Sequence, residues 1–179
     1  MNPAGEVPVL VESDGAIIPG GRVITEYLEE VYRAHPLLPG DSIDRAEVRR
    51  LTEWFDSKFN REVTVNLADE KILSRFIRRG QPDSLAIRAG HANIHYHLDY
   101  IAWLYERRNW LAGKTFSMAD VAAAAELSCV DYLGDVPWDD HPGAKDWYAR
   151  VKSRPGMRGL LADVLPGFPP PKSYPDPDF

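Results

Sequence analysis

The segment 116–127 limits the possible folds more than any other part of the sequence. Ser117 stands three residues before Asp120, the spacing of a capping box, in which the serine side chain accepts from the Asp120 amide and the carboxylate accepts from the Ser117 amide. Phe116 and Val121 occupy the positions of a hydrophobic staple around this box. The run that follows is rich in alanine and nearly uncharged. The pattern predicts a central, buried helix with a defined start.

Apolar residues recur at helical spacing through most of the segment 41–165. One stripe comprises Val48, Leu51, Phe55 and Phe59, and another comprises Ile72, Phe76 and Ile77. The longest stripe advances by four and three residues alternately through Ile87, His91, Ile94, Leu98, Ile101 and Tyr105. A further helix is expected over 141–154, ended by Pro155. The segment 41–165 is therefore predicted to be an all-helical domain of five or more helices.

The residues on either side of this domain have different patterns. Two short apolar runs, 7–11 and 16–18, flank Asp14-Gly15, which is typical of a β-hairpin turn. Helical spacing then resumes after Gly20 and ends near residue 35, before a linker over 37–40. The segment 166–179 has six prolines in fourteen residues, so it is expected to lie extended without a regular element. The predicted parts are 1–36, 41–165 and the tail 166–179.

Composition excludes several classes of protein. The chain has 179 residues and a formal net charge of −6, which argues against a protein that coats nucleic acid. The single cysteine, Cys129, permits no disulfide within the chain and no site with several thiolates, and we interpret it as a small buried packing residue. No apolar run reaches the roughly 20 residues that cross a bilayer. A cytoplasmic protein without a membrane or nucleic-acid partner is expected.

Four stretches, spread over nearly the whole chain, resemble the glutathione S-transferase superfamily, and they occur in the order of that family. They are the stretch 2–10 with Val7-Pro8-Val9-Leu10, the stretch 22–28 with Arg22, Ile24, Tyr27 and Leu28, the stretch Phe116–Asp120, and the stretch Trp147–Pro155. They are similar to the entry into the third strand, the third helix, the capping box of the sixth helix, and the seventh helix with its end. The resemblance implies a mostly α fold: a truncated thioredoxin-like part of two strands and a helix, followed by an all-α domain.

Three further stretches resemble a narrower group, the alphaproteobacterial GST-like proteins that bind the division tubulin FtsZ. They are the stretches 107–113, 131–138 and 169–179. All three lie outside the residues that hold glutathione in the family. This resemblance implies a non-catalytic interaction protein of bacterial cell division, with FtsZ as its partner and a homodimer as its expected state.

The resemblance also indicates where glutathione would bind. In the family the proline at the position of Pro8 is cis, and the backbone of the residue at Val7 pairs with the cysteinyl part of glutathione. The alternative is that Pro8 only shapes the turn. Family members hold the γ-glutamyl group with an acidic or amide residue followed by serine, but here those positions are Gly20 and Gly21, next to Arg22. Glutathione is therefore a possible cofactor with a weakened site, and no cofactor is the favoured expectation.

The strand–helix–strand unit that opens a thioredoxin-like domain has no counterpart in this sequence. That unit carries the tyrosine, serine or cysteine that activates the glutathione thiol, so no catalytic residue is assigned. Two explanations for the missing unit stay open: the true start codon lies upstream of Met1, or the protein is truly this short. The first explanation leaves a second function open, a glutathione transferase that conjugates the thiol to an electrophile.

Two groups of side chains could bind a protein partner. The basic residues Arg75, Arg78 and Arg79 lie at helical spacing beside Lys71 and could dock an acidic protein, although such runs are commonly solvated helix faces. Tyr174 and Phe179 in the tail could anchor a partner, or they could pack onto the chain's own helical domain.

Three histidines, His91, His95 and His97, are close enough in sequence to suggest a metal site. No third ligand stands at helical spacing, so no metal is expected. We interpret His91 as a core residue and His95 and His97 as surface residues.

Overall fold

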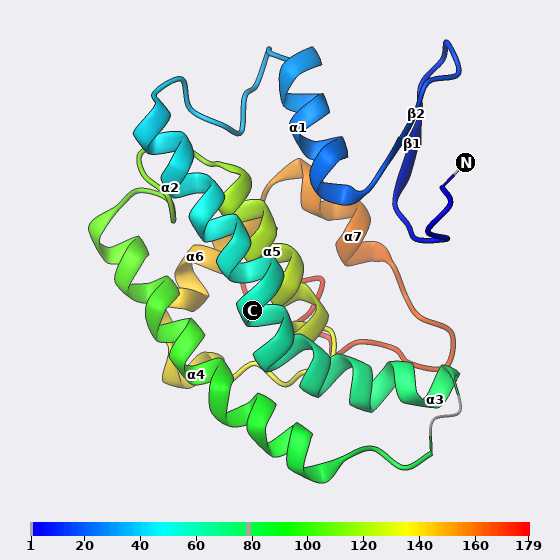
Figure 1. Ribbon diagram of the computed structural model, residues 1–179. Helices are drawn as coiled ribbons and strands as arrows, with labels where there is room; N and C mark the ends of the chain where they lie inside the picture. The colour runs from blue at the N-terminus through cyan, green and yellow to red at the C-terminus, as the bar shows by residue number, and fades with distance from the viewer. Residues whose placement is uncertain (1, 78–79) are drawn as a thin grey trace. The chain divides into compact units, whose positions relative to one another are not determined.

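The computed structural model describes residues 2–77 and 80–179. The contacts divide the chain into two units, residues 1–39 and residues 40–179. The described residues are mostly helical, with one small sheet near the N-terminus, as the sequence predicts. Figure 1 shows both units as ribbons. No helix of the described residues is long and apolar enough to span a membrane.

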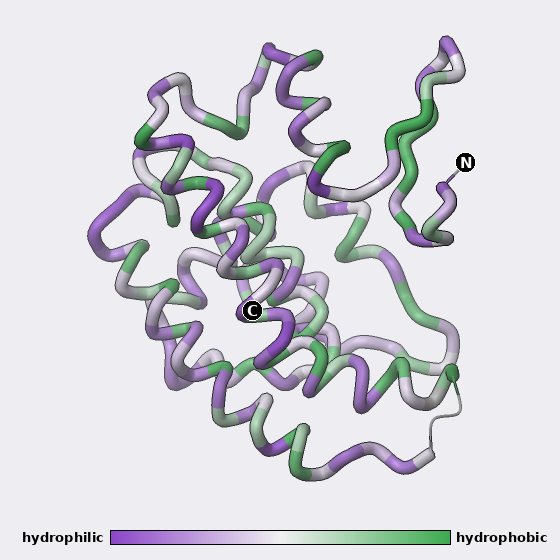
Figure 2. Tube along the Cα trace, viewed as in Figure 1, coloured by the Kyte–Doolittle hydropathy of each residue, from purple (hydrophilic) through white to green (hydrophobic). Residues whose placement is uncertain are grey.

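The first unit consists of two strands and one helix in the predicted order. Strands β1 (Val9–Val11) and β2 (Ile17–Pro19) pair antiparallel, with Leu10 opposite Ile18. Figure 2 shows this hairpin as a strongly hydrophobic part of the trace. Gly15, at φ +90°, forms the turn because a residue with a side chain rarely adopts that conformation.

Helix α1 (Gly21–Val31) is shorter than predicted, since it ends at Val31 and not near residue 35. The segment that follows is held by a side chain of the helix itself. The Glu29 carboxylate accepts from the amides of Leu37 and Leu38, at 2.9 and 3.0 Å. The chain therefore turns back along α1 where the sequence pattern suggested a further helical turn.

The second unit is a helical bundle. Its elements are α2 (Ser42–Glu53), the π-type helix η1 (Trp54–Leu73), α3 (Ser74–Phe76), α4 (Ser84–Arg107), α5 (Met118–Asp131), η2 (Trp138–Asp140), α6 (Pro142–Lys152), η3 (Pro155–Met157) and α7 (Arg158–Ala162). Helices α2, η1 and α3 follow one another without a break (Figure 1). Asp41 and Asp83 cap α2 and α4, each with a carboxylate that accepts from amides of the first turn.

The core lies between η1, α4 and α5. Helix η1 packs against both α4 and α5, and α4 also packs against α6. The predicted stripe from Val48 to Phe59 is fully buried, as are Ile94, Leu98 and Ile101 of α4. The other predicted stripe is wrong in part, because Phe76 is 57% exposed and Ile77 is 50% exposed. Phe76 lies on the wall of an open cavity and not inside the bundle.

Helices α4 and η1 approach each other closely at Gly90. A Cβ at that position would lie 2.8 Å from Cγ of Leu67, a core residue of η1, and 3.0 Å from Cβ of Asn66. Glycine is required here by the space between two helices and not by backbone conformation. The close approach sets the distance at which side chains of α4 reach η1.

Candidate functional site

The positions that resemble a glutathione site lie in the first unit. The Val7–Pro8 peptide bond is cis, and Val7 is 88% exposed directly before β1. Gly20 precedes α1 at φ +94°, and its carbonyl accepts from the amide of Ile24. A small cavity of about 400 Å³ lies along α1, and its lining residues are Arg22, Val23, Glu26, Tyr27 and Glu30. The cavity is bordered by charges of both signs, and Gly20 and Gly21 contribute no side-chain ligand to the start of α1.

A larger cavity lies in the helical unit. Its volume is about 660 Å³, and its walls come from the end of η1, from α3, from the second half of α5, from 160–165 and from the tail. Most of the lining side chains are apolar, among them Ile72, Leu73 and Phe76. Asp69 and Asp163 are its acidic residues. Such a space suits an apolar small molecule.

Cys129 lies on the wall of this cavity, so its interpretation as a buried packing residue is wrong. Cys129 is exposed to solvent at the cavity wall, and its Sγ lies 3.5 Å from the carbonyl oxygen of Ala125. Desolvation and the negative charge of Glu126 raise the pKa of the thiol above its ordinary value. The thiolate, the reactive form, is therefore disfavoured at neutral pH.

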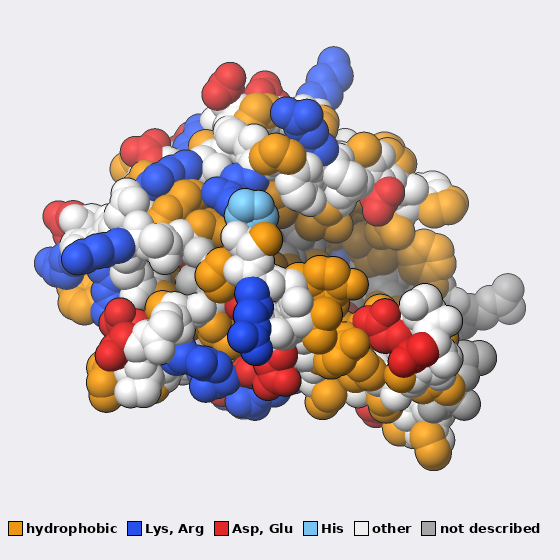
Figure 3. Space-filling model, turned by 90° about the horizontal axis from the view of Figure 1, so that it is seen from above, with side chains coloured by type: hydrophobic (Ala, Val, Ile, Leu, Met, Phe, Trp, Pro, Cys, Tyr) orange, Lys and Arg blue, Asp and Glu red, His pale blue; other side chains and the backbone are white. Residues whose placement is uncertain are grey.

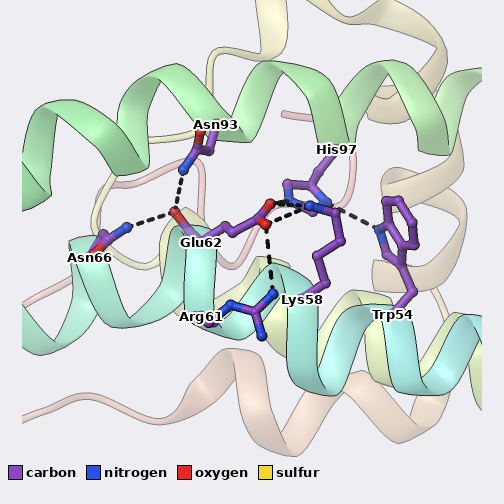
Figure 4. Close-up of polar contacts among 7 residues, drawn as sticks. All are labelled: Trp54, Lys58, Arg61, Glu62, Asn66, Asn93 and His97. Carbon is purple, nitrogen blue, oxygen red and sulfur yellow. Dashed lines mark hydrogen bonds and ion pairs between the residues drawn. The ribbon is translucent and has the colours of Figure 1, made fainter.

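A polar cluster joins η1 to α4 (Figure 4). The Glu62 carboxylate accepts from Nζ of Lys58 at 2.5 and 2.6 Å and contacts Nε2 of His97 at 3.1 Å. Nδ1 of His97 lies 3.1 Å from Nε1 of Trp54, which is a donor only. Because Nδ1 must accept from Trp54, the hydrogen is on Nε2 and His97 is neutral. Burial lowers the pKa of His97, in keeping with that assignment.

The aromatic side chains around this cluster form a surface that we call the aromatic face. It comprises Trp54, Tyr96, Tyr100 and Trp103. Tyr96 is 58% exposed and Trp103 is 48% exposed, while Tyr100 stacks on Trp103 with ring centroids 6.1 Å apart. Cations accompany it: Arg50 donates to the Tyr100 hydroxyl, and Cζ of Arg107 lies 4.7 Å from the centre of the Trp103 ring. Tryptophan, tyrosine and arginine are the residues that dominate protein interfaces.

Ser117 and Asp120 form a capping box at the start of α5. Both carboxylate oxygens of Asp120 are used: Oδ2 accepts from the Ser117 amide, and Oδ1 accepts from the Leu111 amide and from Nε1 of Trp147, each at 3.0 Å. Asp120 is fully buried, and this burial raises the pKa of its carboxyl. Asp120 thus connects α5, α6 and the loop before α5.

The tail packs onto its own helical unit, which overturns Tyr174 as an anchor for a partner. Tyr174 is 2% exposed and clusters with Tyr132 and Leu161. The ring of Phe179 lies against Trp138 and 3.8 Å from Nζ of the buried Lys152. The packing alternative therefore holds for Tyr174, whereas Phe179 packs on the helical unit but stays half-buried.

The predicted basic patch lies partly outside the described residues. Arg78 and Arg79 lie outside the described residues, as does the side chain of Arg75. The neighbouring Lys71 forms an ion pair with Asp135 at 2.5 Å and lies 3.3 Å from Nε2 of His91. This lysine is thus neutralised within the chain.

Two of the three histidines, His91 and His97, have the opposite exposure to the one interpreted from the sequence. His97 is buried in the polar cluster, whereas the side chain of His91 is 43% exposed. Helical periodicity assigned the core role to the wrong histidine because the polar partners of His97 are distant in sequence. Nδ1 of His95 lies 2.8 Å from Nε2 of His141, whose Nδ1 lies 3.0 Å from Asp99. Within residues 2–77 and 80–179, no three His, Cys, Asp or Glu residues are arranged to hold a metal ion.

Figure 3 shows a surface on which hydrophobic side chains lie open among positive and negative ones. In the first unit the exposed hydrophobic residues are Val7, Val11, Ile17, Val23, Val31 and Tyr32. Apolar side chains that remain open on a small unit commonly mark a contact with another chain or segment.

Comparison with known proteins identifies the family. The sequence profile of the glutathione S-transferase C-terminal domain matches residues 91–155. FtsZ-localized protein A of Caulobacter vibrioides is 48% identical over 182 aligned residues, which cover 100% of this chain and 80% of that protein. The chain belongs to the glutathione S-transferase superfamily. Within it, the chain is a relative of FtsZ-localized protein A.

Solved structures of this superfamily agree. The structure of FzlA from C. crescentus has a TM-score of 0.95 at 49% identity, and a glutathione S-transferase from Rhodospirillum rubrum F11 has a TM-score of 0.97 at 60% identity. Each match covers 99% of this chain and 80% of the other chain. The aligned range thus includes the family-like stretches near both ends of the chain.

The site also contains features that the sequence analysis missed. Trp54 and His97 are 43 positions apart, and Asp120 and Trp147 are 27 positions apart. No local pattern connects either pair. The aromatic face could have been suspected from the tryptophan and tyrosines of α4, because Tyr96, Tyr100 and Trp103 recur at helical spacing.

Proposed function

We propose that this GST-superfamily protein is a non-catalytic interaction protein that binds FtsZ filaments in bacterial cell division. The observation that carries the proposal is its 48% identity, over the full chain, to a protein named for its localisation to FtsZ. The stretches 107–113, 131–138 and 169–179, which resemble this subgroup, lie within the aligned range. Because FtsZ filaments assemble in the cytoplasm, we place the protein there as part of the proposal.

Two features of the chain, one in each unit, support a binding role over catalysis. Gly20 and Gly21 stand where transferases use side chains to hold the γ-glutamyl group, and Cys129 has a raised thiol pKa. The two glycines weaken a glutathione site without altering the fold, and the raised thiol pKa disfavours Cys129 as a nucleophile. A protein–protein function needs neither of them.

The test is co-sedimentation of the 179-residue chain with FtsZ assembled in GTP. We expect the chain to pellet with polymers and to stay in the supernatant with FtsZ in GDP. A plant glutathione transferase of the same fold serves as the control. A chain that pellets no more than this control would contradict the proposal.

We also propose a homodimer, with the aromatic face as part of its interface. The face combines exposed Tyr96 and Trp103 with the arginines of α2 and α4, and the polar cluster fixes its position on η1 and α4. Light scattering is expected to give twice the chain mass for the wild type and the monomer mass for Y96S/W103S. The variant L85S, which removes another exposed apolar side chain of α4, should remain dimeric. Wild-type protein that scatters as a monomer at micromolar concentration would refute this part.

The second candidate function is glutathione transfer to an apolar electrophile. Two observations favour it: the likeness, at 60% identity, to the structure of a glutathione S-transferase, and the apolar cavity of about 660 Å³. A ligand at about 100 times its dissociation constant stabilises the native state by roughly 2.7 kcal/mol. Thermal melting with millimolar glutathione therefore separates the two candidates, since a clear rise in Tm favours the transferase and no rise favours the interaction protein.

A further inference from the structure

Two arginines of the second unit are oriented by aromatic rings. Cζ of Arg150, in α6, lies 3.8 Å from the centre of the Trp110 ring, and Cζ of Arg154, just beyond α6, lies 3.8 Å from that of Phe116. The two rings meet edge to face with centroids 5.0 Å apart. Stacking fixes the plane of a guanidinium group, so the N–H groups along its edge point in a defined direction.

The support under this arginine pair is rigid. Trp110 is 6% exposed, and it closes a tight turn with Gly113 through two backbone hydrogen bonds of 2.9 and 3.1 Å. Nη1 of Arg150 donates to the Asn109 carbonyl at 2.8 Å and to Oδ1 of Asn109 at 3.2 Å, so Nε and Nη2 are the donors that remain for a ligand. The Asn109 side chain donates to the carbonyl of Lys114 at 2.9 Å. Because the pair is already held in place, a ligand would bind with little loss of side-chain entropy.

The charge of the pair is not neutralised by the chain itself. Arg50, Lys58, Lys71, Arg107, Arg108 and Lys152 all form ion pairs with carboxylates. Arg150 and Arg154 form none within the part of the chain that the structure describes, although the net charge is −6. Both side chains are exposed, and the exposed Lys114 lies in the same loop as Trp110 and Phe116.

We propose that Arg150 and Arg154 form a docking site for an acidic peptide segment of a partner protein. Cζ of Arg150 lies 3.8 Å and Cζ of Arg154 lies 5.8 Å from the centre of the same Trp110 ring, so the two guanidinium groups are neighbours. Carboxylates two positions apart in an extended chain are separated by about 6–7 Å, so an alternating acidic segment places one carboxylate on each guanidinium. Arginine binds a carboxylate through two parallel hydrogen bonds, a geometry that the ring-stacked planes favour.

The inference deepens the proposed function and rests on it only for the identity of the partner, which would carry the acidic segment. It also gives the chain a basic docking surface distinct from the predicted one at 75–79. Helix dipoles explain why cations occur near the end of α6. They do not explain two stacked guanidinium groups that lack a carboxylate.

The test uses a capped peptide of alternating glycine and glutamate, with its glutamine counterpart as the neutral probe. Nuclear magnetic resonance of the ¹⁵N-labelled chain follows the Trp110 indole signal and the arginine Nε signals. We expect only the acidic peptide to shift them. The variant R150Q/R154Q should bind roughly tenfold more weakly, as expected for two exposed charge pairs, whereas R33Q/R61Q, with the same loss of charge, should bind like wild type.

Equal shifts with both peptides, or equal affinity of wild type and R150Q/R154Q, would overturn the proposal. If the glutamine variant does not fold, R150K/R154K replaces it, because lysine keeps the charge but lacks the planar fork. Wild-type affinity in that variant would also overturn the proposal. The peptide measurement is independent of FtsZ, so failure to pellet with filaments contradicts the proposed function and leaves this inference standing.

Discussion

Asp120 offers the sharpest test of what holds the helical unit together. Its carboxylate accepts from four donors: the amides of Leu111 and Ser117, the Ser117 hydroxyl and the indole of Trp147. Replacing it with alanine leaves the two amides and the indole buried without an acceptor, whereas the Ser117 hydroxyl can rotate. Each orphaned donor costs about 1–3 kcal/mol, so the sum reaches roughly 3–9 kcal/mol. That is comparable with the whole stability of a typical domain, about 5–15 kcal/mol.

We therefore expect D120A to be largely unfolded, and D120N to be folded but weakened. Asparagine keeps an oxygen for Leu111 and Trp147 but turns a donor toward the Ser117 amide, which costs about 1–3 kcal/mol. Urea unfolding followed by circular dichroism measures both variants. The control is D83A, which removes the exposed cap of α4 and should cost only about 1 kcal/mol. A D120A protein as stable as D83A would refute the view that this carboxylate connects three elements.

Three further predictions concern buried groups. Burial lowers the pKa of His97 below 6.5, so the free energy of unfolding is highest above pH 6.5 and falls at lower pH, where only the unfolded chain takes up the proton. Urea titrations from pH 7.5 to 5.5 should show this loss in wild type and less of it in H97Q. Burial raises the pKa of Glu126 above 4.5, so its ionisation destabilises the fold as pH rises. E126Q should therefore gain stability relative to wild type between pH 4 and pH 7, and a difference in unfolding free energy that stays constant over this range would contradict the assignment. G90A forces a Cβ to within 2.8 Å of Leu67 and should cost about 1–3 kcal/mol, whereas G159A, at an open position, should not lower Tm by a comparable amount.

The elements that depend on neighbouring residues were predictable. The capping box at Ser117, the hairpin around Gly15 and the stripe from Val48 to Phe59 are encoded within a few turns of chain, and the structure contains all three. The end of α1 was not predictable, because it depends on Glu29 reaching amides eight and nine residues further on. Local periodicity has no information about such a contact.

The candidate site was predictable only in part, for the same physical reason. Tyr174 becomes a core residue because Tyr132 and Leu161 meet it from distant parts of the chain, and the cluster around His97 needs both η1 and α4. Cys129 has apolar neighbours in sequence, yet it lies on a cavity wall whose other side is formed by 160–165. A stripe pattern identifies which residues are apolar, but the element that covers them determines whether they are buried.

The buried Lys152 affects how a complex with FtsZ could be mapped by chemical cross-linking. Its ammonium is covered by the Phe179 ring and donates to the Ser173 carbonyl at 3.0 Å, and burial lowers its pKa. Amine-reactive cross-linkers need an accessible lysine, so Lys152 will not be cross-linked whether or not a partner lies over α6. The exposed Lys114 and Lys172 are the residues whose cross-links would report a bound filament on this unit. A cross-link at Lys152 would instead indicate that the tail had left its place.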